Sequence, residues 1–395
     1  MKKYYPYLIT VSHMINDSCQ SVLPALLPLF IYTYGLSLEQ AGFLILANTA
    51  LSSLLQPLLG YLSDKINQPR LIALGVLLSA CSTGAMGFVT SYESLLVCAT
   101  LAGVGSSIFH PEGAKIMNRL GGGKKGKAMG TFAIGGSSGF AIGPLFAGSI
   151  AYTVGPHGLA AFTIVGLIIS TVLFVLMPRI VTCARTIDQA VAMENPTLVA
   201  KPLKNYWKYF GILFVIILSQ SVNFRVINAF IPIFWTRELG TSPEQGSFAL
   251  TIFFSIGIFM TYIGGLLGDK YGPIKIIRLS LLIWLPAMFL LTEVPTFSPV
   301  IMMPVAYLLL LMIGAAKAIS YSPVIVLGQT YLAKSIGFAS GITLGVSQTI
   351  GGIIAPVVGN LADTYTLPIA MITLVPFLVM GLGASLILKD PKKLQ

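Results

Sequence analysis

The chain contains twelve stretches of apolar residues, each long enough to cross a lipid bilayer as a helix. A transmembrane helix needs about 20 predominantly apolar residues. In lipid, a helix satisfies its backbone hydrogen bonds internally, so such segments favour α-helices over other structures. The segments lie at residues 7–34, 39–62, 70–90, 94–118, 127–153, 157–177, 207–235, 245–268, 274–292, 299–320, 337–362 and 366–388.

The composition agrees with a membrane-embedded chain. Apolar residues make up 55% of the sequence and charged residues only 9%, whereas charged residues are roughly 25% of a soluble domain. The mean hydropathy is +0.85. The sequence therefore predicts an all-α integral membrane protein with twelve transmembrane helices.

The positions of the basic residues predict how the helices are oriented. Cytoplasmic loops of membrane proteins carry an excess of Lys and Arg. With the N-terminus inside the cell, all of the 24 lysines and arginines fall on the cytoplasmic side except Arg225, Arg237 and Lys317. We therefore expect both termini in the cytoplasm. The net charge of +11 reflects this topology, and without a soluble domain to carry a basic face we expect no nucleic-acid partner.

The chain is divided near its midpoint by a single long polar stretch. The predicted organisation is an N-terminal six-helix bundle at 1–177, a cytoplasmic linker at 178–206 and a C-terminal six-helix bundle at 207–395. The two halves resemble each other: "GYLSDKINQPR" at 60–70 matches "GGLLGDKYGPIK" at 264–275. Internal duplication of six-helix units is typical of transporters that move two bundles about a central site.

A short glycine and acid motif recurs at helix ends in both halves. The glycine allows close helix approach, and the aspartate can cap the next helix or pair with loop Lys and Arg. A related pair, Gly359 and Asp363, follows later in the chain. We interpret the motif as a conformational-switch element formed by Gly60, Asp64 and Lys65 in the first half and by Gly265, Asp269 and Lys270 in the second.

With these motifs the sequence resembles the major facilitator superfamily. Within it, the chain is similar to the fosmidomycin resistance protein family of bacterial drug exporters. The resemblance is carried by "SHMINDSCQSVLPALLPL" at 12–29, "SSLLQPLLGYLSDK" at 52–65, "GVGSSIFHPEGAK" at 103–115 and "SPVIVLGQTYLAKSIGFASGITLGVSQTIGGIIAPVVGNLAD" at 322–363. It implies two pseudo-symmetric six-helix bundles and a secondary active exporter driven by proton influx.

Polar residues on the first helix form the first candidate site. His13, Asn16, Asp17 and Gln20 fall at i, i+3, i+4 and i+7, which is one face of an α-helix. Asp17 lies about 16 Å along the helix from Pro6, near the middle of the bilayer. Removal from water favours the neutral, protonated carboxyl group, so we assign Asp17 to proton coupling and His13, Asn16 and Gln20 to substrate binding. The alternative is a polar network that fastens this helix to its neighbours.

The fourth segment holds two further ionisable residues, His110 and Glu112, around Pro111. Charged groups inside a membrane are costly and usually functional, so we assign both to proton coupling. Glu112 can instead form a structural clamp with Lys115 or Arg119. Many drug/proton antiporters of the superfamily carry an Arg before the Gly-x-Gly of this helix, but the stretch "VCATLAGVG" has none.

The sequence predicts no metal site. The His-Pro-Glu tripeptide lacks the second His that a zinc-protease helix needs. The four cysteines have no CxxC spacing, so we interpret them as packing residues.

The C-terminal half supplies two cations within apolar segments. Lys317 lies about 25 Å of helix from Lys334, too far to reach the cytoplasmic surface. Together with Arg225 it suits an anionic or zwitterionic ligand. We assign Asn223, Arg225, Lys317 and Tyr321 to substrate binding. The alternative is ion pairing of the cations with Asp17 or Glu112, because buried charges favour partners.

The function that follows is proton-coupled export of a small anionic or zwitterionic molecule, such as a phosphonate antibiotic or a polycarboxylate metallophore. A proton-coupled importer of a small organic anion is an alternative, and so is a membrane-embedded enzyme, although no nucleophile or metal constellation supports one. We expect no cofactor beyond the proton gradient. We also expect a monomer, in contact with protons, substrate and lipid, in the bacterial inner membrane.

Overall fold

The computed structural model describes residues 4–66, 68–122, 125–194, 204–334, 339 and 342–391. Within this part of the chain, regular structure is helical, and the helices are joined by turns and short loops. The α-helices are α1 (Tyr5–Ala25), α2 (Leu27–Tyr34), α3 (Leu38–Ile66), α4 (Leu71–Ala85), α5 (Tyr92–Leu120), α6 (Lys125–Thr153), α7 (Ala160–Glu194), α8 (Trp207–Arg237), α9 (Pro243–Tyr271), α10 (Pro273–Glu293), α11 (Pro299–Ile319), α12 (Tyr321–Tyr331), α14 (Ser347–Thr364), α15 (Leu367–Ile372) and α16 (Val375–Ile387).

These helices correspond to the twelve expected spans. Nine of the described helical segments are long and apolar enough to cross a membrane, and α1 with α2, bent by 47°, forms a tenth. The shorter helix α4 and the 18-residue helix α14 occupy the two remaining positions. The prediction of an all-α membrane protein with the twelve-helix architecture is confirmed.

The described chain divides into two compact units. Unit 1 comprises residues 1–23 and 47–201, and unit 2 comprises residues 24–46 and 202–395. Unit 2 therefore includes α2 and the first residues of α3, which precede most of unit 1 in the sequence. The boundaries 1–177, 178–206 and 207–395 remain a prediction.

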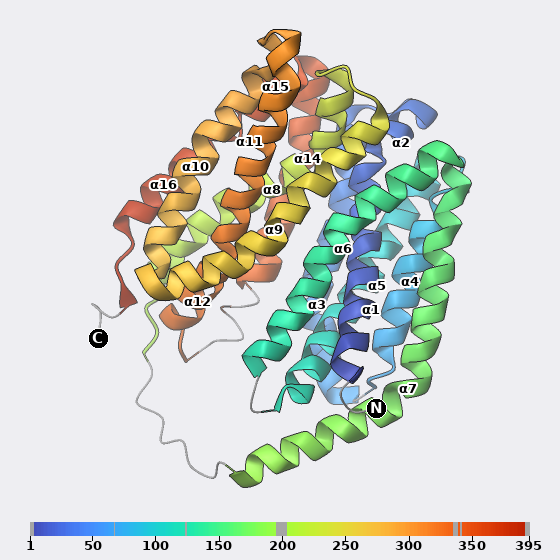
Figure 1. Ribbon diagram of the computed structural model, residues 1–395, viewed down its shortest axis with the longest axis vertical. Coiled ribbons are helices and arrows are strands. Elements are labelled where there is room, and N and C mark those ends of the chain that lie inside the picture. The colour runs from blue at the N-terminus through green and yellow to red at the C-terminus, as the bar shows by residue number, and fades with distance from the viewer. Residues whose placement is uncertain are drawn as a thin grey trace. The chain divides into compact units, whose positions relative to one another are not determined.

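In unit 1, α4 packs against both α5 and α7, and α5 packs against α6. Figure 1 shows α4, α5 and α7 side by side. The core contains Ile9, Phe109, Met117 and Met177, all fully buried. Large apolar side chains are also exposed along the outer face of α7, which is costly in water but suits a surface that faces lipid.

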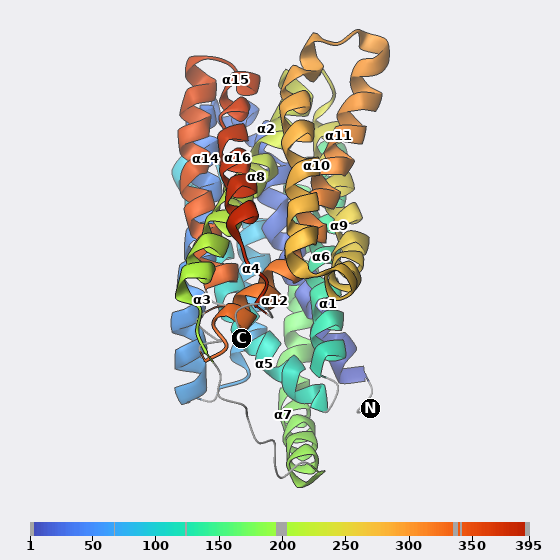
Figure 2. The ribbon, with the colours of Figure 1, turned by 90° about the vertical axis from the view of Figure 1, so that its left-hand side faces the viewer.

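In unit 2, α9 packs against α11, and α8 packs against both α14 and α16. Figure 2 shows α9, α10 and α11 as neighbours. The core is aromatic, with Phe230, Trp235 and Trp284 fully buried. The helix α9 begins with a capping box in which the Ser242 side chain accepts a bond from Gln245 N, and Pro243 occupies the first turn, where it removes no helical hydrogen bond.

Corresponding glycines pack the same way in the two units. A Cβ on Gly103 of α5 would lie 2.1 Å from the Asn48 carbonyl oxygen of α3. A Cβ on Gly314 of α11 would lie 2.7 Å from the Phe253 carbonyl oxygen of α9. In each unit, therefore, the absence of a side chain lets the fourth span approach the backbone of the second, as expected for an internal duplication.

The stretch predicted as a linker from residue 178 is helical in its first part. The helix α7 continues through Pro178 to Glu194, and Figure 1 shows that it bends part-way along its length. A proline inside a helix removes a backbone hydrogen bond and kinks the helix, which accounts for a bend without a break. Residues 195–203 lie outside the described residues.

Candidate functional site

The four polar residues predicted to share one face of α1 are all buried within unit 1. His13, Asn16, Asp17 and Gln20 are each at most 8% exposed. The helix is regular from Tyr5 to Ala25, so the i, i+3, i+4 and i+7 spacing places them on the face turned toward α4, α5 and α6.

The carboxyl group of Asp17 lies at the centre of an ionisable cluster. Its Oδ2 is 3.1 Å from His13 Nε2, and its Oδ1 is 3.4 Å from His110 Nε2 on α5. Asn16 Nδ2 donates a hydrogen bond of 3.0 Å to Oδ1. We call His13, Asp17 and His110 the α1 cluster. The structure thus brings together two residues assigned to proton coupling and one assigned to substrate binding.

The sequence predicts no metal site, but the α1 cluster places three possible metal ligands close together. The possible ligand atoms of its three residues lie within 4.8 Å of one another. The spacing of residues along one helix could not reveal this grouping, because His110 comes from a different helix. Two imidazoles and a carboxylate provide a place for a cation, and tertiary packing supplies the second imidazole from α5.

The imidazole of His13 is held firmly between helices. Its Nδ1 is 2.7 Å from the carbonyl oxygen of Phe132 on α6, and its ring stacks on the Phe132 ring with centroids 3.9 Å apart. Beside it, a Cβ on Gly136 would lie 2.6 Å from His13 Cε1 and 2.7 Å from Asp17 Oδ2. Gly136 is therefore needed for α6 to approach this face of α1.

The two amide side chains of the α1 face fasten α1 to its neighbours. Asn16 Nδ2 lies 3.3 Å from Ser106 Oγ on α5. Gln20 Nε2 donates to Ser79 Oγ on α4 at 3.1 Å and to the Ala102 carbonyl on α5 at 2.9 Å. These bonds are the ones expected from the alternative interpretation, a polar network between helices.

Glu112 lies two residues beyond His110 and is 3% exposed. The helix α5 stays helical across Pro111, from Tyr92 to Leu120. Pro111 therefore does not break the helix. His110 is the more accessible of the two, with 26% of its side chain exposed.

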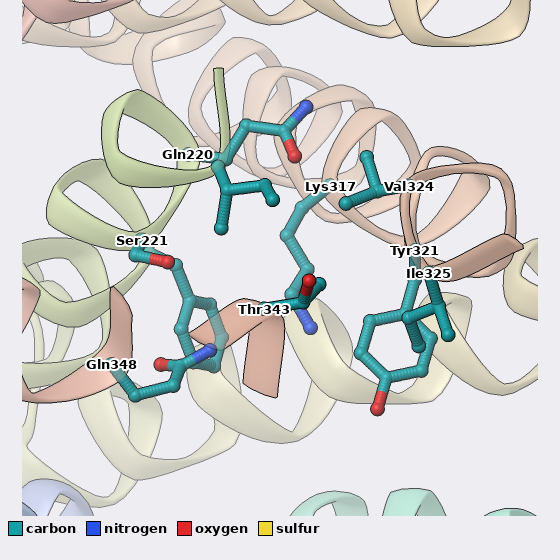
Figure 3. Close-up of a pocket in the computed structure, with 10 residues that line it drawn as sticks. Gln220, Ser221, Lys317, Tyr321, Val324, Ile325, Thr343 and Gln348 are labelled. Atoms are coloured by element: carbon teal, nitrogen blue, oxygen red, sulfur yellow. The ribbon is translucent and has the colours of Figure 1, made fainter. Parts of the chain in front are cut away.

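Unit 2 contains a pocket that includes two of the predicted substrate residues, Lys317 and Tyr321 (Figure 3). Figure 3 shows the Lys317 side chain reaching into the space between Gln348 and Tyr321. We call it the cationic pocket. Its lining residues are Ile217, Gln220, Ser221, Phe224, Lys317, Tyr321, Val324, Ile325, Thr343 and Gln348.

Lys317 lines this pocket, whereas Arg225 does not line it and instead bonds to the lining residue Gln348. Lys317 Nζ lies 4.3 Å from the centre of the Phe224 ring and 5.4 Å from that of Tyr321. Arg225 Nε donates to Gln348 Oε1 at 2.9 Å. Within the described part of unit 2, no carboxylate forms an ion pair with either cation. The buried Gln220 Nε2 also has no hydrogen-bond partner, so the pocket has an excess of donors.

Asn223 does not lie in the cationic pocket. Its Nδ2 donates to the carbonyl oxygens of Ser219 and Leu374, and the residue is fully buried. It fastens α8 to the start of α16. Sequence reasoning in turn missed Gln348 and Gln220, because uncharged amides in long apolar helices stand out only when their partners are known.

The switch motifs differ in how far the structure describes them. Gly60 lies in α3, but its surroundings and the side chains of Asp64 and Lys65 lie outside what is described. In α9, a Cβ added to Gly265 would lie 3.8 Å from the Ser322 side chain. Asp269 is exposed, and Lys270 Nζ lies 5.0 Å from the centre of the Tyr271 ring.

The related element in α14 forms a helix cap within unit 2. Asp363 Oδ1 and Oδ2 accept bonds of 2.8 and 2.9 Å from Leu38 N and Glu39 N, at the start of α3. Gly359 packs on the same turn, since a Cβ there would lie 2.3 Å from the Leu38 carbonyl oxygen. The expectation that an aspartate of this motif caps a helix is met at Asp363, although the capped helix is not the next one in the chain.

Comparison with known proteins extends over the whole chain. The model of the Major Facilitator Superfamily matches residues 9–356 and, separately, 210–394. The chain is 31% identical over 393 residues to the uncharacterized MFS-type transporter YfnC of Bacillus subtilis strain 168, covering 98% of this chain and 94% of the relative. It is 29% identical over 358 residues to the fosmidomycin resistance protein of Escherichia coli strain K12, covering 90% and 85%.

The fold is similar to that of solved transporters. An inward-facing, occupied structure of a bacterial homologue of the human lysosomal transporter Spinster matches with a TM-score of 0.76 and 17% identity, covering 97% of this chain and 96% of that one. At this level of identity, the comparison shows the architecture alone.

Proposed function

Because the chain belongs to the Major Facilitator Superfamily, whose members are membrane transporters and not enzymes, we propose that it is a proton-coupled exporter of a small anionic or zwitterionic molecule. A phosphonate antibiotic and a polycarboxylate metallophore are the two substrate types that we propose. The proton gradient is the driving force, and no other cofactor takes part. The protein works as a monomer in the bacterial inner membrane, with both termini in the cytoplasm.

The observation that carries the substrate class is the excess of cationic and donor groups at the cationic pocket. Lys317 is held against aromatic rings, Arg225 donates to Gln348, and Gln220 Nε2 has no partner. A carboxylate or phosphonate accepts several charge-assisted hydrogen bonds at once, and these are the strong ones. A neutral molecule can accept hydrogen bonds from these donors but lacks the charge-assisted part, and a cationic molecule would be repelled by Lys317.

The α1 cluster supports the coupling to protons. A buried carboxyl group that contacts two imidazoles forms a cluster of titratable side chains that can hold a proton within the membrane. We assign the coupling to Asp17 and His110, with Glu112 as a further buried acid on α5. The similarity to the fosmidomycin resistance protein of Escherichia coli favours export, because removal of a drug from the cell is a direct route to resistance.

Inverted membrane vesicles containing the full-length protein test the proposal. The vesicle interior is made acidic relative to the medium, and uptake of labelled fosmidomycin is followed. A polycarboxylate chelator is tested in parallel. We expect accumulation that stops when an ionophore collapses the pH gradient. Transport that is unaffected by the ionophore would overturn proton coupling, and transport of neither anion but of a neutral analogue would overturn the substrate class.

Two conservative variants sharpen this assay. Asp17→Asn and Glu112→Gln keep the side-chain shape but cannot titrate, so we expect each to abolish accumulation driven by the gradient. His157→Gln serves as the control, because His157 lies in a short 3-10 helix outside the cluster and contacts Phe88. If both acid variants accumulate substrate as the wild type does, the two carboxyl groups are structural.

A further inference from the structure

The hydrogen bond between His13 and Phe132 determines which nitrogen of His13 carries a hydrogen. The partner is a backbone carbonyl oxygen on α6, 2.7 Å from Nδ1. A carbonyl oxygen can only accept a hydrogen bond. Nδ1 must therefore be the donor, and neutral His13 has an unprotonated Nε2.

That assignment makes the contact on the other side of the ring informative. His13 Nε2 faces Asp17 Oδ2 at 3.1 Å. An unprotonated imidazole nitrogen and a carboxylate oxygen are both acceptors, so they would repel each other at this distance. The contact is favourable only when one additional proton lies between the two atoms.

Other contacts indicate where this proton resides. The second carboxyl oxygen of Asp17 accepts from Asn16 Nδ2 at 3.0 Å, and His110 Nε2 is 3.4 Å from the same oxygen. The amide donor of Asn16, directed at the carboxyl group, favours its ionised form. The additional proton therefore belongs on His13, which makes an imidazolium beside a carboxylate.

We infer that His13 is the residue that binds the transported proton, at Nε2, and that Asp17 is its counter-ion. This inference rests on the proposed proton coupling. It assigns His13 to proton coupling, whereas the sequence analysis assigned it to substrate binding. When the proton leaves for the aqueous side, a neutral imidazole with its hydrogen on Nδ1 remains beside the carboxylate. Two acceptors then face each other, and the contact between Nε2 and Oδ2 must open.

The surroundings of His13 restrict how the ring can respond to loss of the proton. The ring is stacked on Phe132, and Gly136 leaves it no space. If the remaining hydrogen moved to Nε2 to restore the contact with Asp17, Nδ1 would become an acceptor facing the Phe132 carbonyl. Loss of the proton therefore breaks either the contact within α1 or the bond between α1 and α6. Proton release is in this way linked to the packing of two helices.

Few other titratable groups act on this pair. From α5 the facing group is His110, with Glu112 two residues beyond it. From α6, the described neighbours of His13 are the Phe132 backbone and ring and Gly136, none of which titrates. On α1 itself, the buried thiol of Cys19 lies two positions along the chain from Asp17.

Nitrogen-15 NMR of the three histidines tests the inference on the full-length protein in nanodiscs, with EDTA present so that no metal occupies the cluster. The chain has only three histidines. His157→Gln leaves the α1 cluster intact and identifies the His157 signals, and His13→Gln identifies the His13 signals by their loss. At pH 7 we expect both ring nitrogens of His13 to be protonated. Asp17→Asn should remove the Nε2 hydrogen and leave the Nδ1 hydrogen in place.

Two results would overturn the inference. One is a neutral His13 at pH 7, whichever ring nitrogen carries the hydrogen; a hydrogen on Nε2 would also contradict the bond to Phe132. The other is a His13 that stays doubly protonated in Asp17→Asn, which shows that Asp17 does not retain the proton. The measurement uses neither a gradient nor a substrate. It can therefore fail while vesicle transport remains proton-coupled, and it can succeed if transport proves independent of protons.

Discussion

Replacing Asp363 by Asn removes the charge that caps the start of α3. The carboxylate accepts bonds from both Leu38 N and Glu39 N, two of the amide groups that have no partner inside the helix. An Asn side chain of the same shape offers one oxygen acceptor, so one of the two bonds is lost together with the negative charge at the positive end of the helix dipole.

The expected magnitude follows from these two bonds. Loss of an N-cap acceptor costs about 1 kcal/mol, and Asp363 is exposed, so solvent weakens the charge contribution. We therefore expect Asp363→Asn to destabilise the first turn of α3 by about 1 kcal/mol, which is about a fivefold change in local opening. Asp363→Ala, which removes both bonds, should cost about 2 kcal/mol and raise the opening about thirtyfold.

Hydrogen exchange measured by mass spectrometry on peptides covering residues 36–46 reports this local opening. Asp269→Asn is the matched control, because it makes the same chemical change in the corresponding motif of α9, where the described structure has no such cap. We expect faster exchange in the two Asp363 variants and an unchanged, wild-type rate of exchange in the control. If both Asp363 variants remain folded and exchange at the wild-type rate, the cap does not stabilise α3 and the argument is wrong.

Three further predictions concern the pocket, the cluster and the topology. Lys317→Ala and Arg225→Ala should weaken binding of an anionic ligand about tenfold or more and leave binding of a neutral analogue nearly unaffected, because only the anion uses charge-assisted bonds. Calorimetric titrations of both ligands measure this, and equal losses of affinity would contradict the anion site. Gly136→Ala should reduce gradient-driven transport at least tenfold, since its Cβ would meet His13 and Asp17. The control Gly130→Ala should transport at the wild-type rate, because a Cβ there meets nothing within 4 Å. A single cysteine at Thr186, which is exposed on α7, should react with an impermeant thiol reagent in inverted vesicles and not in intact cells; the reverse pattern would place the termini outside.

The sequence alone determined the class of structure because the relevant physics is local. Twelve apolar stretches of the length of a bilayer leave few alternatives to helices, and each stretch can be recognised without knowing its neighbours. The stripe from His13 to Gln20 follows from the 3.6-residue period in the same way. Gly103 and Gly314 lie at matching positions of the two halves, and their close packing against Asn48 and Phe253 gives the resemblance of the halves a structural reason.

Only the tertiary structure decided how the polar residues are paired. Asp17 meets His110 from 93 positions away in the numbering, and the His13 ring meets a backbone carbonyl at Phe132, for which no side chain gives a signal. Asp363 caps α3 across 325 residues. Such contacts depend on which helices pack together and in what register, and this is set by the shapes of whole helix faces. A periodic pattern fixes the face that a residue lies on, but it does not identify the partner across the interface.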